Sequence, residues 1–407
     1  MSQVREAPRS KRKAILVTYP DEFTKAEAIG LAEAVGFEVK QVVVQRYLKH
    51  AEYGVGSGKA EEIRQIAAAT GCGEIIVDEG LTSSQVYNLT NLTGQHITDR
   101  EKLILDIFAT RATTTEAKLQ VQLAELGYEM PRARMNVRLS VKGEQQGLSG
   151  MGESAVDVRF RALKKRMSAI KEKLRDAGKR RSLHRSQRQK LNMPFVSLVG
   201  YTSSGKTTLF NRLANEDKEV ASSLFTTLGT TTRTVTLPDS TKILLSDTVG
   251  FISRLPTYMI EAFKSTLEEL DYADLVLLLV DASETSSDVA IKFDACLTTL
   301  KELKVPLSKV IVILNKSDIA SQTTIEEARN IAGGLPCTVI SAERGDGTHV
   351  LKSLIRKKLS PPPQETLPTQ SLRPLTLGPN RRSEAASQAE NGLAPPAPTT
   401  MLDHKEL

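Results

Sequence analysis

The sequence of 407 residues predicts two α/β domains that are joined by a helical linker. Short apolar runs alternate with helical stretches over the first hundred residues and again over residues 194–358, which is the pattern of α/β domains. Between these regions, apolar residues recur every three or four positions, which indicates long helices. The composition, with 40% apolar and 25% charged residues, is that of a globular protein and excludes a wholly disordered chain.

The N-terminal α/β domain is expected over residues 13–128, after a basic tail at residues 1–12. Apolar runs predict strands at residues 14–17, 39–44 and 74–77. Helices are predicted at residues 25–35, 59–69 and 83–92. From Arg100 to Leu126 the apolar residues keep helical spacing, so the domain is expected to end in one long packing helix.

The linker over residues 129–193 contains a glycine-rich loop and then a strict heptad repeat. Its apolar positions are Val156, Phe160, Leu163, Met167, Ile170 and Leu174. Alternating spacings of four and three residues place one narrow seam against a partner helix. This helix is predicted to run from Ser154 to Ala177 and to end at Gly178. A second basic helix at residues 181–191 is expected to fold back on it as a hairpin.

Residues 159–190 hold fourteen lysine or arginine residues against two acidic ones, a net charge of +12 in a chain whose total is +7. Such a balance is typical of a surface that binds a polyanion, whereas a merely solvated helix face usually carries both signs. Because the seam is used in packing, the basic side chains are expected to project outward. Candidate RNA-binding residues are Arg159, Arg161, Lys164, Lys165, Lys179, Arg180, Arg181 and Arg185.

A strand at residues 195–199 runs directly into a glycine-rich loop and a helix, a setting that predicts a nucleotide site. The loop fits the pattern G-x-x-x-x-G-K-[ST] with Gly200, Tyr201, Thr202, Ser203, Ser204, Gly205, Lys206 and Thr207. Its glycines allow backbone amides to wrap phosphates, and the helix N-terminus adds partial positive charge. Lys206 is expected to reach the outer phosphates, and the hydroxyl of Thr207 to bind Mg²⁺.

Three further motifs follow predicted strands. Their residues are Asp247, Thr248, Val249 and Gly250, then Asn315, Lys316, Ser317 and Asp318, and finally Ser341, Ala342 and Glu343. A carboxylate at a strand end can bind the outer coordination shell of Mg²⁺. The amide of Gly250 can contact a γ-phosphate. The carboxylate of Asp318 can accept hydrogen bonds from guanine N1–H and N2–H₂, a donor pair that adenine lacks. These motifs together predict a guanine nucleotide.

The four motifs resemble those of translational P-loop GTPases of the Obg–HflX superfamily. Other segments resemble the HflX family, at residues 54–63, 99–109, 116–126, 131–132 and 150–153. The resemblance implies an α/β fold with a P-loop GTPase domain at residues 194–358, preceded by a smaller α/β domain and a coiled-coil-like helical hairpin. It also implies a GTP-hydrolysing switch that binds the large ribosomal subunit and its rRNA in the GTP state, in ribosome splitting, rescue or subunit quality control.

A threonine-rich loop at residues 225–233 precedes Asp247, and its composition alone does not select the switch threonine. The resemblance selects Thr227, within a loop formed by Phe225, Thr226, Thr227, Leu228 and Gly229. Lys206, Thr227 and Gly250 are then expected to be catalytic. Thr207 and Thr227 are expected to bind Mg²⁺ directly, and Asp247 to hold its outer shell.

Two departures from common GTPase patterns affect the expected rate. Gly229 and Thr230 replace an Asp-Pro pair of the family, which leaves the switch loop less rigid. Phe251 follows Gly250 at the position where many GTPases place a glutamine that orients water. Because phenylalanine neither donates nor accepts a proton, intrinsic hydrolysis is predicted to be slow and to be stimulated by the ribosome.

Two other functions stay open on the sequence alone. One is an ATP-using P-loop enzyme, which Asp318 disfavours, and the other is a constitutive RNA-binding protein with a vestigial nucleotide site. No apolar run is long enough for a membrane span, so a cytoplasmic protein without a membrane partner is expected. The heptad seam can be satisfied within the hairpin, so the chain is expected to be a monomer. The proline-rich tail at residues 359–407 is expected to be disordered.

Overall fold

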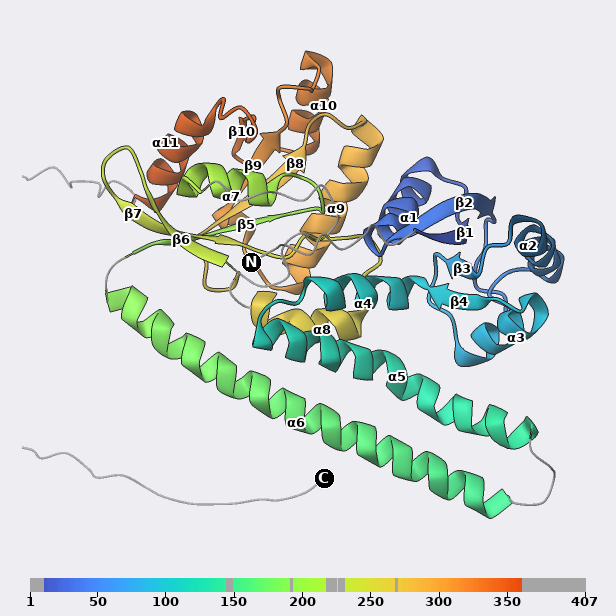
Figure 1. Cartoon of the computed structure of the whole chain (residues 1–407). Helices are drawn as coiled ribbons and strands as arrows, with labels where there is room; N and C mark the ends of the chain where they lie inside the picture. The colour runs from blue at the N-terminus through green and yellow to red at the C-terminus, as the bar shows by residue number, and fades with distance from the viewer. Residues whose placement is uncertain are drawn as a thin grey trace, which may run out of the picture. The chain divides into compact units, whose positions relative to one another are not determined.

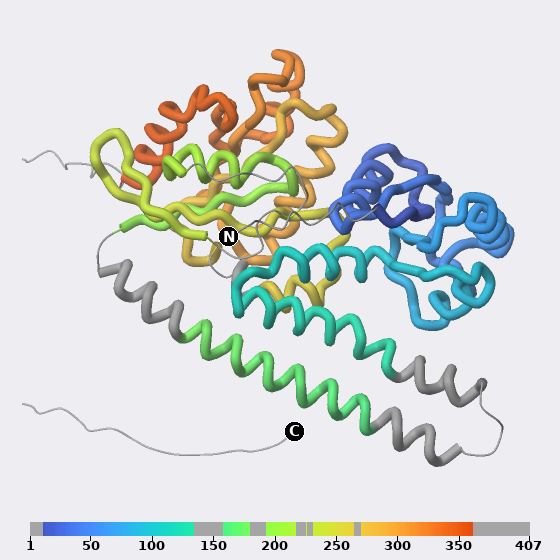
Figure 2. Tube along the Cα trace, in the orientation of Figure 1, coloured from blue at the N-terminus to red at the C-terminus, as the bar shows by residue number. Residues whose placement is uncertain are grey.

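The computed structural model describes the backbone of residues 11–143, 149–190, 193–216, 225, 231–267 and 270–360 (Figures 1 and 2). Most of the predicted N- and C-terminal tails therefore lies outside the described residues. Within these ranges, none of the helices combines the length and the apolar character that a membrane crossing requires.

The N-terminal domain is built on a four-stranded parallel sheet in the order β2-β1-β3-β4. Its strands are β1 (Arg12–Thr18), β2 (Phe37–Val44), β3 (Glu74–Val77) and β4 (His96–Asp99). Its first helices are α1 (Glu22–Ala34), α2 (Ser57–Thr70) and α3 (Ser83–Thr93). All four residues of β3 are buried, as expected for a strand that has neighbours on both sides.

The expectation of one long helix from Arg100 to Leu126 is wrong, because the chain forms two helices there, α4 (Arg100–Arg111) and α5 (Thr115–Gly143). Ala112 adopts an extended backbone and ends α4. Three consecutive threonines follow, and the Thr114 hydroxyl accepts a hydrogen bond from the amide of Ala117 at 3.1 Å. This local bond starts a new helix, which is the usual role of threonine at such a position.

The two helices that pair in the linker hairpin are not the two that the sequence predicted. A single helix, α6 (Ser149–Lys190), continues through Gly178 instead of ending there, and its partner is α5 (Figure 1). Ile170 and Leu174 of the heptad seam are buried, and Leu163 and Met167 pack against the same core. The seam from Leu163 to Leu174 is therefore confirmed, but it is covered by the helix that precedes it rather than by residues 181–191. The side chain of Val156 lies outside the described residues.

The basic side chains of α6 project outward as the heptad predicted. The exposed candidates are Arg159, Arg161, Lys164, Lys165 and Lys179. The side chains of Arg180, Arg181 and Arg185 lie outside the described residues. The outward row therefore gives α6 a solvent-facing basic surface along the described part of its length.

The C-terminal domain is built on a six-stranded sheet in the order β10-β9-β8-β5-β7-β6, in which only β6 runs antiparallel to its neighbour. Its strands are β5 (Phe195–Gly200), β6 (Thr231–Thr236), β7 (Lys242–Asp247), β8 (Leu275–Asp281), β9 (Val310–Asn315) and β10 (Cys337–Val339). All seven residues of β8 are buried. This uninterrupted apolar strand explains the longest apolar run of the sequence.

Helices cover both faces of this sheet (Figure 1). They are α7 (Lys206–Ala214), α8 (Thr257–Leu267), α9 (Ser286–Glu302), α10 (Gln322–Ile331) and α11 (Thr348–Leu359), with a short 3₁₀ helix at Leu307–Lys309. Apolar side chains of α7 and α11 share one core with the sheet. Those of α8, α9 and α10 belong to a second core that also takes in α4, α5 and α6. The fold class predicted from the sequence is confirmed.

Candidate functional site

The glycine-rich loop between β5 and α7 needs its two glycines. Gly200 has φ +150°, and a Cβ there would lie 2.4 Å from the carbonyl oxygen of Leu279. Gly205 has φ +92°, and a Cβ there would lie 2.2 Å from Nδ2 of Asn315. Any other residue would collide with neighbouring strands, so these positions require glycine. The loop thus brings its backbone to the N-terminus of α7, the arrangement expected for binding phosphate.

Lys206, the first residue of α7, is buried beneath this loop. Its Nζ donates hydrogen bonds to the carbonyl oxygens of Gly200 at 3.0 Å and Tyr201 at 2.7 Å. Burial lowers the pKa of Lys206 to about 8, and the nearby carboxylate of Asp247 opposes this shift. The ammonium group is thus poorly solvated, so an anion brought next to it would restore its usual pKa.

Thr207 and Asp247 bring two hard oxygen donors together at the edge of the sheet. Oγ1 of Thr207 donates a hydrogen bond to Oδ2 of Asp247 at 2.9 Å. Within the described ranges, no group of three or more histidine, cysteine or acidic residues could hold a metal ion. This pair fits Mg²⁺, which binds through one or two protein oxygens, waters and substrate phosphates rather than in an all-protein cage.

Asn315 connects its own loop to two others, at the end of the site where a base is expected to bind. Its Nδ2 donates to the carbonyl oxygen of Ser204 at 2.8 Å, and its Oδ1 accepts from the amide of Ala342 at 2.9 Å. Arg212 fastens the same loop by donating to the carbonyl oxygens of Ala342 and Glu343. The loop expected to bind phosphate and the two motifs expected to recognise the base therefore form one connected unit.

Asp318 and Lys316 extend from this unit. A hydrogen bond from Ser341 holds the pKa of Asp318 below its usual value, so its carboxylate is ionised at neutral pH. Lys316 has φ +63°, and its Nζ forms an ion pair with Oδ2 of Asp281 at 2.5 Å. An ionised carboxylate beside a fixed loop is the acceptor that a guanine base requires.

The segment after β7 crosses directly over the phosphate loop. The amide of Phe251 donates to the carbonyl oxygen of Gly200 at 3.0 Å, and the amide of Thr202 donates to that of Phe251 at 2.8 Å. A Cβ on Gly250 would lie 3.1 Å from Nζ of Lys206. Gly250 is therefore adjacent to the lysine, and the Phe251 side chain is buried away from solvent.

The loop that is expected to act as the switch is described at one residue only. Phe225 is buried with φ +56°, and its ring centroid lies 4.8 Å from that of Phe108 in α4. Phe108 also meets Phe263 of α8, again with 4.8 Å between the centroids. The expected switch residues Thr226, Thr227, Leu228 and Gly229 lie outside the described residues.

An ionic network that the sequence does not reveal joins the N-terminal domain to the segment after Gly250. Arg100 pairs with Asp78 at 2.6 Å and with Glu27 at 2.5 Å, and its side chain is only 4% exposed. Arg254 pairs with Asp78 at 2.9 Å. Arg100 and Glu27 are 73 residues apart, and Glu27 and Ser253 are 226 residues apart, so local patterns carry no sign of these contacts.

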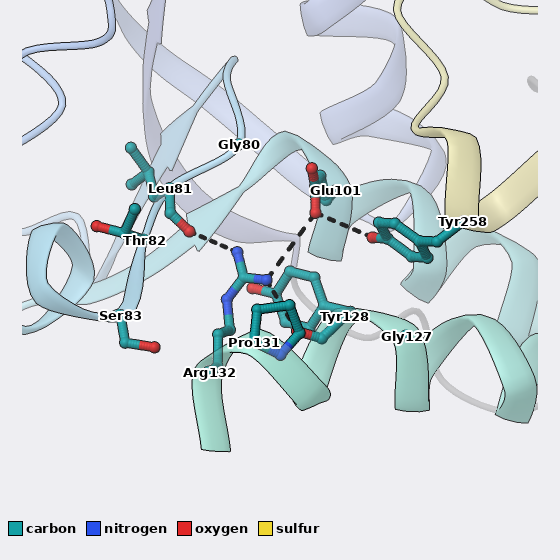
Figure 3. A pocket seen from close by; sticks show the side chains of 10 residues that line it. All are labelled: Gly80, Leu81, Thr82, Ser83, Glu101, Gly127, Tyr128, Pro131, Arg132 and Tyr258. Carbon is teal, nitrogen blue, oxygen red and sulfur yellow. Dashed lines mark hydrogen bonds and ion pairs between the residues drawn. The ribbon is translucent and has the colours of Figure 1, made fainter. Parts of the chain in front are cut away.

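A hollow of about 420 Å³ lies beside this network, between α5, the loop before α3 and α8 (Figure 3). Arg132 points into it, stacks on the ring of Tyr128 and pairs with Asp99 at 2.6 Å. On its other side, the hydroxyl of Tyr258 donates to Glu101 at 2.9 Å. Burial raises the pKa of Glu101. The charged groups of the hollow already engage one another, so it forms part of the contact between the domains.

Three family models together cover most of the chain. They are described as GTP-binding GTPase N-terminal at residues 23–109, GTP-binding GTPase middle region at residues 111–188, and 50S ribosome-binding GTPase at residues 195–316. Their order matches the N-terminal domain, the helical hairpin and the C-terminal domain of the structure.

Curated relatives agree with these matches. GTPase HflX of Thermococcus kodakarensis is 40% identical over 75% of this chain and 69% of its own length. GTPase HflX of Escherichia coli is 36% identical over 81% of this chain and 78% of its own length. A Sulfolobus solfataricus GTP-binding protein in complex with GDP has a TM-score of 0.46 and 24% identity, over 85% of this chain and 98% of that one. The chain belongs to the HflX family of GTPases and is a GTP-hydrolysing enzyme.

Proposed function

We propose that this chain is a GTP-driven switch that binds the large ribosomal subunit in its GTP-bound form and acts in ribosome splitting or rescue in the cytoplasm. The observation that carries the proposal is the exposed basic row of α6, which includes Lys164 and Lys165. It lies opposite a seam that packs on α5, so its charges face solvent. A row of this kind suits the phosphates of rRNA. The match of residues 195–316 to a model described as 50S ribosome-binding GTPase supports the same partner.

The nucleotide is proposed to bind along the loop from Gly200 to Thr207. Lys206 would exchange its two carbonyl partners for oxygens of the β- and γ-phosphates, while the loop amides hold the remaining oxygens. Thr207 and Asp247 are proposed to hold Mg²⁺. Thr227, which lies outside the described residues, is proposed as a further ligand. Bound Mg²⁺ would offset negative charge on the phosphates during hydrolysis.

Hydrolysis is proposed to be slow without a partner. A water molecule attacks the γ-phosphorus, and the bond from that atom to the bridging oxygen breaks, with Lys206 and the Gly250 amide stabilising negative charge. Phe251 follows Gly250, but its ring is buried and offers no proton acceptor. The chain therefore lacks a water-orienting side chain at this position, and ordering of Thr227 by the ribosome would accelerate the reaction.

Guanine selection is proposed to come from Asp318. Its carboxylate would accept two hydrogen bonds from the base, and Asn315 would keep the three surrounding loops in place. Lys316 would cover one face of the ring. The pKa of Asp318 is held below its usual value, so this acceptor stays charged throughout the neutral range.

Co-sedimentation with purified ribosomal subunits tests the proposal. The wild-type chain is expected to bind the large subunit with a non-hydrolysable GTP analogue and to dissociate with GDP, and binding should weaken steeply with salt. A variant with Lys164→Glu and Lys165→Glu should bind at least tenfold more weakly and show a smaller salt dependence. The matched control carries Lys357→Glu and Lys358→Glu, the same change at two exposed positions of α11.

The alternative is a constitutive RNA-binding protein with a vestigial nucleotide site. Equal binding with the analogue, with GDP and without nucleotide would favour it and would contradict the switch. The buried, fully connected Asn315 and the poorly solvated Lys206 favour an intact nucleotide site.

A further inference from the structure

Asp281, the last residue of β8, is a buried carboxylate to which the proposed function assigns no role. Its side chain is 7% exposed. Its Oδ1 accepts hydrogen bonds from the amide of Ser283 at 3.1 Å and from the hydroxyl of the same residue at 2.6 Å. Its Oδ2 forms the ion pair with Nζ of Lys316 at 2.5 Å. The carboxylate is therefore oriented by its own loop through one oxygen and holds the lysine through the other.

The sheet brings Asp281 and Lys316 together from two different loops. Strands β8 and β9 are neighbours (Figure 1), and Asp281 is paired in register with Asn315, the residue before Lys316. The amide of Ala282 donates to the carbonyl oxygen of Asn315 at 3.0 Å, which extends this pairing beyond the end of β8. The position of the carboxylate relative to the lysine is therefore set by the regular structure of the sheet.

Both ends of the Lys316 side chain are fixed. At the backbone, φ is +63°, a conformation that residues other than glycine rarely adopt. The carbonyl oxygen of Lys316 accepts hydrogen bonds from the amides of Ile319 and Ala320, both at 3.1 Å. At the other end, the ammonium group is held by Asp281. The flexible four-carbon stem of the lysine thus runs between two fixed points, while the side chain remains 32% exposed.

The ion pair determines what Lys316 offers to a nucleotide. An ammonium group that is already paired with a carboxylate presents little net charge to a phosphate or to a ribose oxygen. The methylene groups of the stem stay available for contact with an aromatic ring, because a lysine can pack its stem while its charged end is satisfied elsewhere. The nearby carboxylate of Glu284 pairs with Lys292, so it does not compete with Asp281 for Lys316.

We propose that Asp281 is a positioning residue for the guanine nucleotide, which holds the ammonium group of Lys316 so that the lysine presents its stem, and not its charge, to one face of the base. The proposal rests on the base site proposed above, in which Asp318 accepts hydrogen bonds from the edge of the guanine. Contact with the ring face is the same for all purines that resemble guanine, whereas the contact with Asp318 depends on the groups at the edge. Inosine diphosphate lacks the amino group at C2, so comparing it with GDP separates the two contributions.

Nucleotide affinities of the full-length chain test this proposal. Asp281→Asn keeps the shape of the side chain and an acceptor for Ser283, but it removes the charge that holds Lys316. The variant is expected to bind GDP and inosine diphosphate each about tenfold more weakly, so that their ratio stays within about twofold of the wild-type ratio. A loss of structure in the loop would also displace Asp318 and would therefore change the ratio.

Two further variants serve as controls. Glu284→Gln is the matched control, because it removes a carboxylate of the same loop that pairs with Lys292 rather than with Lys316. It should bind both nucleotides with wild-type affinity. Asp318→Asn reports on the base site itself and should weaken GDP more than inosine diphosphate, because only guanine offers the second donor. An unchanged ratio in Asp318→Asn would overturn the base site and, with it, the role of Asp281.

A double-mutant cycle with Lys316→Met determines whether Asp281 acts through the lysine. The chain that carries both Asp281→Asn and Lys316→Met should bind GDP no more weakly than the weaker single variant. Its affinity relative to wild type should not change with salt, because neither chain presents net charge to the nucleotide at this position.

Four results would each overturn the role of Asp281 while a shifted ratio in Asp318→Asn leaves the base site in place. They are wild-type GDP affinity in Asp281→Asn, a ratio that shifts as it does in Asp318→Asn, a double variant weakened by the product of the single effects, and a salt-dependent difference between the double variant and wild type.

Discussion

Replacement of Arg100 by methionine measures how strongly the buried ionic network holds the N-terminal domain. The change keeps most of the side-chain length but removes the charge that faces Asp78 at 2.6 Å and Glu27 at 2.5 Å. These three side chains are 2–6% exposed, so water cannot replace the lost partner.

The expected loss of stability follows from what remains around the two carboxylates. Breaking a buried ion pair by removing one partner costs about 3–5 kcal/mol. Asp78 would still pair with Arg254 at 2.9 Å, and Glu27 would still accept from Ser253. We therefore expect a loss near the lower end, about 3 kcal/mol in the free energy of unfolding.

Urea unfolding followed by circular dichroism measures this loss, with the slope of the transition compared between variants. Arg64→Met is the matched control, because Arg64 pairs with Glu61 on the exposed surface of α2 and its side chain is 45% exposed. The control should unfold at the wild-type urea concentration. A loss of less than about 1 kcal/mol for Arg100→Met would refute the account of the network.

Three further predictions concern the base, the lysine and the helix break. Asp318→Asn should lower GTP affinity by about a hundredfold and raise affinity for xanthosine triphosphate, measured by competition with labelled nucleotide. GTP affinity should fall as the pH rises above about 8, by at most tenfold per pH unit, because the phosphates need protonated Lys206 and the free protein loses that proton. Titration calorimetry above pH 8 should show proton uptake on binding, and no uptake would contradict it. Thr114→Ala should destabilise the start of α5 by about 1 kcal/mol, measured by urea unfolding, because it removes the acceptor of the Ala117 amide.

The nucleotide motifs were predictable because each lies within one short stretch of chain. Gly200 and Gly205 stand between an apolar strand and a helix, and the backbone angles confirm that the loop needs both. Asn315 follows a buried strand and reaches the neighbouring loops directly. In these places the local sequence determines the local structure, and the sheet then brings the strand ends together.

The helical region was predictable in part. The heptad identified the buried seam of α6 but not the helix that covers it, because any apolar helix face could satisfy the seam. The continuation through Gly178 reflects the modest cost of one glycine inside a long helix that packs along its length. The break before Thr115 depends on a cap that the apolar spacing does not reveal.

The contact between the N-terminal domain and the segment after Gly250 could not be predicted. Glu27, Arg100 and Ser253 are ordinary polar residues in their local sequence, and only the fold brings them together. A buried ionic network has no spacing rule, because its members are chosen by proximity in space. Residue roles that depend on such contacts become visible only in the structure.

The proposed ribosomal switch is tested by the rate of GTP hydrolysis with and without purified large ribosomal subunits. Slow hydrolysis by the chain alone is predicted, because Phe251 supplies no proton acceptor beside Gly250. Acceleration by large subunits is predicted to be on the order of a hundredfold or more, and little acceleration is predicted with small subunits at the same concentration. An unchanged rate with saturating large subunits would contradict the proposed ribosomal switch.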